Sequence, residues 1–141
     1  MFPQTMHIAT LCMTAVLLTA LGACKAPAPK TKLANPASEN CISHGGTHTT
    51  GRSPKGGEFG VCLFEDNRQC EEWALLLGHC PVGGVKVAGY ATQAARFCGI
   101  TGGQYTATAN SGAADEQGSC TLPDGTSCDA QAYFGGECTR K

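Results

Sequence analysis

The sequence contains few aromatic and few charged residues. Of its 141 residues, 6% are aromatic and 15% are charged, and the formal net charge is −1. Without an excess of positive charge, the chain lacks the electrostatic attraction on which nucleic-acid binding depends, so we expect no nucleic-acid partner. The scarcity of large side chains also limits the apolar surface that a small unit can bury. Covalent cross-links or a metal are therefore expected to stabilise the fold.

The sequence has no apolar stretch as long as the roughly 20 residues that a membrane-spanning helix needs. An apolar run from residue 8 to residue 20 has the length of a signal-peptide core. The next four residues, Leu21-Gly22-Ala23-Cys24, resemble the bacterial lipobox, in which the cysteine is lipidated and becomes the new N-terminus. We therefore expect residues 1–23 to be a lipoprotein signal peptide and Cys24 to be the lipid attachment site. An ordinary cleaved signal or a short anchor helix is the alternative.

Residues 24–33 are rich in proline and lysine, and we expect them to form an extended tether. Its lysines would lie close to anionic lipid headgroups, which attract them. Lys25 follows the lipobox cysteine where inner-membrane lipoproteins of enterobacteria carry aspartate, and this resemblance favours the outer membrane, facing the periplasm. The remainder of the chain, from residue 34 onward, is mildly acidic, with 7 basic and 11 acidic residues.

Eight of the 10 cysteines follow Cys24 and reveal a tandem duplication. They fall into two sets of four, separated by 21 or 22 residues, then by 8, then by 10: Cys41, Cys62, Cys70 and Cys80, and Cys98, Cys120, Cys128 and Cys138. We therefore place one repeat at residues 34–81 and a second at residues 82–141. Each repeat is too small to be held together by packing alone, so we expect it to be closed by its own disulfides.

Each repeat carries the same order of local signals. Asn35 before Pro36, and Thr92 at the matching position, predict N-caps for helices over 36–43 and 93–100. An alternation of apolar residues at 59–63 predicts a strand, and turn-forming residues at 65–68 and 123–126 predict a hairpin. A second helix should end at Gly78 and at Gly136. The expected fold is α+β, with two tandem disulfide-rich repeats, each helix–β-hairpin–helix. The connector at 81–89 reads equally well as a strand or a loop.

The cysteine spacing favours disulfides over zinc, because zinc sites use closely paired ligands and no two of these eight cysteines are nearer than eight residues. An exported protein also meets an oxidising compartment. Eight helical residues between Cys70 and Cys80 would separate them by about 12 Å, too far for a bond. The pairs predicted on this basis are Cys62–Cys70 and Cys41–Cys80 in the first repeat, with Cys120–Cys128 and Cys98–Cys138 in the second. We expect no metal and no cofactor.

The residues with chemical potential cluster near the start of the second helix of repeat 1. Asp66, Glu71 and Glu72 could act in acid–base chemistry, but a turn residue and two acids that interact with the helix dipole explain them better. No histidine lies beside a serine or cysteine in a nucleophile setting, so we expect no catalytic residue and no enzyme. Trp73, with Leu76 and Leu77, forms an apolar stripe that we expect to face the core more readily than a partner. The candidate binding residues are Trp73, Glu71 and Glu72.

Two stretches resemble a known family of small cysteine-rich bacterial envelope proteins, catalogued as a domain of unknown function and often labelled haemolysins. The first runs from Ala34 to Ser38 and includes Cys41 and the following Gly45-Gly46; the second runs from Gly60 to Cys80 through Cys70-Glu71-Glu72-Trp73-Ala74. The second repeat departs from the pattern, with Gln131 at the tryptophan position and Ala130 at the second glutamate. The resemblance implies an envelope setting and brings no catalytic residues. The mature sequence has no long amphipathic stretch that would support haemolysis.

These observations together predict a non-enzymatic bacterial envelope lipoprotein. It would present two disulfide-stapled modules that bind or protect a protein or another envelope component in the periplasm, with the lipid anchor as its membrane contact. The alternative is a secreted inhibitor-like or haemolysin-type effector. A third hypothesis is an enzyme that uses the carboxylates near the second helix.

Replacing the lipobox cysteine tests the predicted anchor. The Cys24→Ala variant should no longer be labelled by radioactive fatty acid and should leave the membrane fraction, because two or three acyl chains on that cysteine would hold the protein there. Maturation of the unchanged protein should be blocked by globomycin. A variant that still sediments with membranes would show that the apolar run or the folded part is the anchor.

Overall fold

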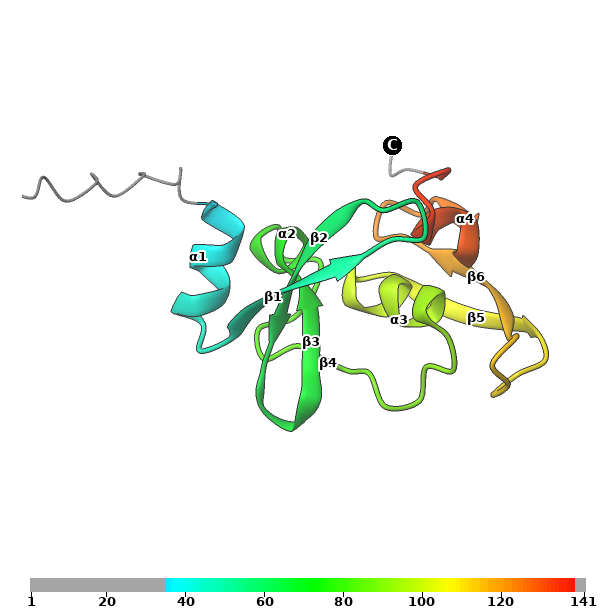
Figure 1. The fold of residues 1–141 in the computed structure, drawn as a ribbon, viewed down its shortest axis with the longest axis horizontal. Helices are drawn as coiled ribbons and strands as arrows, with labels where there is room; N and C mark the ends of the chain where they lie inside the picture. Colours follow the sequence, from blue (N-terminus) through cyan, green and yellow to red (C-terminus); the bar gives the residue numbers. More distant parts are fainter. Residues whose placement is uncertain (1–34, 139–141) are drawn as a thin grey trace, which may run out of the picture. The chain divides into compact units, whose positions relative to one another are not determined.

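The computed structural model describes residues 35–138, which belong to one compact unit. The expected signal peptide, the lipid attachment site Cys24 and the tether lie outside the described residues. The described part contains two copies of one α+β unit, in which a helix is followed by a three-stranded antiparallel sheet and a second helix (Figure 1). The chain is thus a duplication at the level of structure as well as sequence.

The two repeats have matching elements. Repeat 1 contains α1 (Pro36–Ser43), β1 (Thr47–Arg52), β2 (Glu58–Leu63), a short 3-10 turn η1 (Glu65–Asn67), β3 (Arg68–Glu71) and α2 (Glu72–Leu76). Strand β4 (Val85–Lys86), from the connector, adds to its sheet in the order β1-β2-β3-β4. Repeat 2 contains α3 (Gln93–Ile100), β5 (Gln104–Ala109), β6 (Gln117–Thr121), β7 (Ser127–Asp129) and α4 (Ala130–Phe134), with the sheet order β5-β6-β7.

The first helix of each repeat lies where the capping signals predict it. The Asn35 side chain accepts a hydrogen bond from the Ala37 backbone N–H at 3.1 Å, and the Thr92 hydroxyl accepts one from that of Ala95 at 3.1 Å. Strands β1 and β5 were not predicted as separate elements, because they are polar, threonine-rich and largely exposed. The pairing of β4 with β3 decides between the two interpretations of the connector in favour of a strand.

The predicted disulfide pairing is wrong, although the predicted strand register is right. Cys62 lies opposite Cys70 across the hairpin, yet Cys62 bonds to Cys41 on α1 and Cys70 bonds to Cys80 after α2. The prediction assumed eight helical residues between the two cysteines. In fact α2 ends at Leu76, Gly78 turns the chain back with φ 74°, and the Cys80 N–H donates to the Ala74 carbonyl at 3.1 Å. This return brings the Cα atoms of Cys70 and Cys80 to 5.8 Å.

Repeat 2 has the same sequential pairing, and every disulfide among the described residues lies within one repeat. The bonds are Cys98–Cys120 and Cys128–Cys138, and Cys120 lies opposite Cys128 without bonding to it. The loops closed by the four disulfides span 10 to 22 residues. Each closure stabilises the fold by about 3 kcal/mol in the chain-entropy model.

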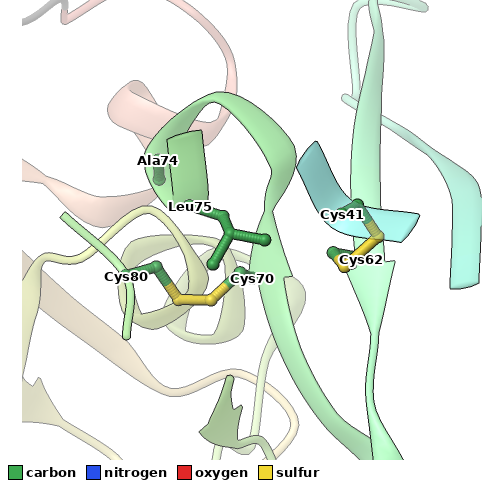
Figure 2. Packing of buried hydrophobic residues seen from close by; sticks show 6 residues of the cluster. All are labelled: Cys41, Cys62, Cys70, Ala74, Leu75 and Cys80. Carbon is green, nitrogen blue, oxygen red and sulfur yellow. A yellow bond between two sulfur atoms is a disulfide. The ribbon is translucent and has the colours of Figure 1, made fainter. Parts of the chain in front are cut away.

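The apolar stripe on α2 faces the opposite way from the expectation. Trp73 is 48% exposed and Leu77 is 60% exposed, whereas Glu72, Ala74 and Leu75 are buried. The core of repeat 1 consists mainly of the two disulfides, and Leu75 packs beside the Cys70–Cys80 bond (Figure 2). The disulfide joins the strand before this short helix to the chain after it, and the helix buries the face that packs against the bond.

The two repeats meet through an aromatic residue of repeat 1. Phe59, on β2, packs against the hydrophobic core of repeat 2. Its ring centroid lies 4.9 Å from that of Phe97 on α3 and 6.3 Å from that of Phe134 on α4, both in edge-to-face geometry. Such pairs add stability beyond the area that they bury. Repeat 1 therefore completes the core of repeat 2.

Removing the Phe59 ring should weaken repeat 2 although the residue belongs to repeat 1. We expect Phe59→Ala to lower the free energy of unfolding by about 2–3 kcal/mol, the low end for a phenylalanine because the ring is only partly buried. Hydrogen exchange should show the loss of protection at α3 and α4. Phe64→Ala is the matched control, because Phe64 is a partly buried phenylalanine that packs against the core of repeat 1. Equal loss of protection in α3 and α4 for both variants would contradict the proposed coupling.

Candidate functional site

A groove lies where α2 of repeat 1 meets the helices of repeat 2. It has a volume of about 340 Å³. Its wall is mostly apolar and draws on both repeats: Phe59, Glu71, Trp73, Ala74, Leu77, Phe97, Thr101, Tyr133, Gly136 and Cys138. An apolar concavity of this size, with a small number of polar groups, is typical of ligand-binding sites in proteins.

Two of the three predicted binding residues line this groove. Trp73 stands on α2 with nearly half of its surface exposed. Glu71 is the N-cap of the same helix, where its carboxylate accepts hydrogen bonds from the backbone N–H groups of Trp73 at 3.1 Å and Ala74 at 2.8 Å. These bonds hold the negative charge at a fixed place beside the tryptophan. The expectation that Trp73 is a core residue is therefore wrong.

The aromatic side chains on the repeat 2 side form a packed array. The Phe97 ring centroid lies 5.2 Å from that of Tyr133 and 5.2 Å from that of Phe134. Because Phe97 also contacts Phe59, the rings that line the groove support one another across the junction between the repeats. The sequence gives no sign of this, since Phe59, Phe97 and Tyr133 are far apart in the chain and only the fold brings them together.

The third predicted binding residue, Glu72, lies outside this groove in a separate polar cluster. Its side chain is 1% exposed. One carboxylate oxygen accepts a hydrogen bond from the Ser38 hydroxyl of α1 at 2.8 Å, and the other lies 2.5 Å from Nδ1 of His48 on β1. The His48 side chain is 44% exposed. A buried carboxylate costs free energy unless such partners satisfy it, so the three residues depend on one another.

This cluster has the residue types of a hydrolase triad but not the required arrangement. In a triad, the histidine stands between the serine and the acid and contacts them through different ring nitrogens. Here Ser38 bonds directly to Glu72, and its hydroxyl lies 3.4 Å from the same Nδ1 that faces the carboxylate. The histidine therefore cannot relay a proton from the serine in this arrangement. Neither Ser38 nor His48 was identified from the sequence as a partner of Glu72.

Repeat 2 replaces all three members of this cluster. Ala95, Tyr105 and Ala130 stand at the positions of Ser38, His48 and Glu72. A Cβ atom on Gly60 would strike the Glu72 carboxylate, and one on the matching Gly118 would strike the Tyr105 ring. The tyrosine ring thus fills the space that the buried carboxylate occupies in repeat 1. Burial raises the pKa of Tyr105 to about 12, and the neighbouring Glu116 carboxylate adds to the shift.

The described residues contain no group of three or more histidine, cysteine or acidic side chains placed to hold a metal. Within residues 35–138, no helix combines the length and apolar character needed to cross a membrane.

Transplanting the repeat 2 residues into repeat 1 tests the interdependence of the Glu72 cluster. Glu72→Ala alone should cost about 3 kcal/mol of unfolding free energy, because it leaves Ser38 and His48 without their shared acceptor and opens a cavity. The triple variant Ser38→Ala, His48→Tyr, Glu72→Ala should recover most of that loss, since the same set packs in repeat 2. Urea unfolding measures both. Strictly additive effects of the three substitutions would contradict the coupling.

Comparison with known proteins gives one family. Searches of curated proteins and of solved structures each give no match. The sequence matches the family described as Domain of unknown function (DUF333) twice, over residues 32–79 and 89–137, and these two matches cover more than half of the chain. Both matched stretches include a helix–sheet–helix unit of the structure. The chain therefore belongs to the DUF333 family and carries two tandem copies of its domain.

Proposed function

We propose that this protein is a non-enzymatic binding module of the bacterial cell envelope, held at the outer membrane by a lipid on Cys24 and facing the periplasm. The observation that carries the proposal is the groove at the junction of the repeats. Trp73, the single tryptophan of the chain, lines this groove and is half exposed. A large aromatic side chain beside a concave apolar surface is a typical anchor for a ligand.

The disulfides support the proposed location. All eight cysteines of the two repeats are bonded, and disulfides of this density persist in secreted and periplasmic proteins rather than in the cytosol. The lipobox-like sequence before Cys24 and the cationic tether support attachment to a membrane surface. Two disulfides in each repeat would keep the groove rigid at the end of the tether.

The side chains of the groove favour binding over catalysis. Its carboxylate, Glu71, caps a helix, and its cysteine, Cys138, is bonded to Cys128. A reaction centre needs a nucleophile or an acid–base pair within reach of the substrate. The lining residues offer mainly aromatic side chains instead, and the Thr101 hydroxyl already donates to the backbone carbonyls of Phe97 and Cys98.

Site-specific photocrosslinking in living cells tests the proposed function. A photoreactive phenylalanine analogue at position 77, which lines the groove, should crosslink a defined envelope component. The same analogue at Val82, which is equally exposed outside the groove, is the control. The adduct should disappear when Tyr133→Ala alters the opposite wall. Identical adducts from both positions, or an adduct indifferent to Tyr133→Ala, would overturn the groove as the binding site. Recovery of an unlipidated product from the medium would favour the secreted effector.

A further inference from the structure

We propose that the Cys128–Cys138 disulfide is a site of thiol–disulfide exchange, which a reduced dithiol opens while the other three bonds of the repeats stay closed. This inference concerns a covalent bond and goes beyond the binding function proposed above. It follows from a difference in burial between the two repeats, which are otherwise closed by the same sequential pairing.

Cys138 is the one cysteine of the two repeats that the fold leaves partly exposed. The exposed fraction of the other seven is 7% or less, and it is 0% for Cys70 and 2% for Cys80, which form the matching bond of repeat 1. Cys138 also lines the groove at the junction of the repeats. A thiolate attacks a disulfide only where it has access to a sulfur atom, so access selects this bond.

Strand β4 covers the matching bond of repeat 1. It pairs with β3, and Val85 packs against the hydrophobic cluster that contains Cys70 and Cys80. In the sheet of repeat 2, β7 is an outermost strand, and no strand within residues 35–138 takes the place of β4. The bond that begins on β7 therefore lacks this cover.

The hydrophobic cores of the repeats differ in the same sense. The core of repeat 1 includes both of its disulfides, whereas that of repeat 2 includes only Cys98–Cys120. Leu75 packs beside the second bond of repeat 1 (Figure 2), while Tyr133 at the matching position is partly exposed and lines the groove. The second bond of repeat 2 thus lies outside the buried core.

The exchange proceeds in two steps. One thiolate of the dithiol attacks the sulfur of Cys138 and forms a new S–S bond, and the bond to Cys128 breaks with its electron pair on Cys128, which takes a proton from water. The second thiolate of the dithiol then attacks the reductant's own sulfur in this mixed disulfide and releases Cys138, which is protonated in turn. The dithiol is thereby oxidised to a disulfide, and the protein gains two electrons and two protons as two thiols.

The bond closes a loop that forms one wall of the groove. The loop includes α4, and its residues Tyr133, Gly136 and Cys138 line the groove. Opening the bond removes the covalent link between the end of this loop and β7. The oxidation state of Cys128 and Cys138 therefore determines how firmly this wall is held.

Partial reduction of the intact protein under native conditions tests the inference. Limiting dithiothreitol, followed by alkylation and peptide mapping, should modify Cys128 and Cys138 at least about tenfold faster than Cys70 and Cys80, because a buried bond reacts only after the structure opens. The Cys70–Cys80 bond is the matched reference, since both bonds join residues 10 apart in sequence. Equal rates for these two bonds, or simultaneous opening of all four, would overturn the inference.

A monothiol identifies the sulfur that is attacked. Reduced glutathione should form a mixed disulfide with Cys138 and leave Cys128 as a free thiol, because Cys128 is only 7% exposed. Acid quenching followed by mass spectrometry locates the glutathione. An adduct found mainly on Cys128 would show that the assigned point of attack is wrong.

Two valines of the connector test whether β4 provides the protection. Val85→Ala should speed reduction of the Cys70–Cys80 bond by about threefold or more, because weaker packing of β4 makes local opening easier. It should not change the rate for the bond of repeat 2. Val82→Ala, which alters a 63% exposed valine, is the matched control and should change neither rate. Circular dichroism confirms that both variants are folded. An unchanged Cys70–Cys80 rate in Val85→Ala would contradict the role assigned to β4.

Discussion

The disulfides that join the hairpin of each repeat to its first helix and to the chain after its second helix are the constraint on which the rest of the structure depends. Cys62 and Cys70 lie opposite each other on β2 and β3, and their partners Cys41 and Cys80 bring in the helices from either side. The core of repeat 1 is made largely of these sulfur atoms, with Leu75 and Ala74 as its main hydrocarbon side chains. A unit of this size has too little apolar area to fold without them.

Because two disulfides make up most of the core of repeat 1, its Phe59 ring is available for the junction. Phe59 completes the core of repeat 2, and Phe97 links it to the groove wall. The matching positions at the outer ends of the pair are polar: Asn40 replaces Phe97 on α1, and Gln117 replaces Phe59 on β6. Repeat arrays end in such polar faces, which prevent further stacking. The aromatic contact that joins the two repeats is therefore not repeated at these outer positions.

The sequence predicted the elements of this fold better than their connections. Capping residues such as Asn35 and Thr92 act locally, so the first helix of each repeat and the hairpin register could be derived from the sequence alone. The disulfide pairing depends on the length of α2, which has five residues and ends at Leu76, whereas the prediction assumed eight helical residues. The apolar stripe of Trp73, Leu76 and Leu77 predicted a buried tryptophan, but the helix turns its Ala74 and Leu75 face inward instead. The groove could not be predicted, because its rings converge only after the repeats pack.

The difference between the repeats shows that Glu72 depends on its partners Ser38 and His48. A buried carboxylate is stable only with partners. Its partners are Ser38 on helix α1 and His48 on strand β1. Repeat 2 forms the same fold without any of the three, using the Tyr105 ring to fill the space. The fold therefore does not require the carboxylate. Replacing the three residues one at a time would pass through a variant in which the remaining polar groups lack their partners and the protein is less stable. This coupling predicts that the three residues are replaced together, and all three differ between the two repeats.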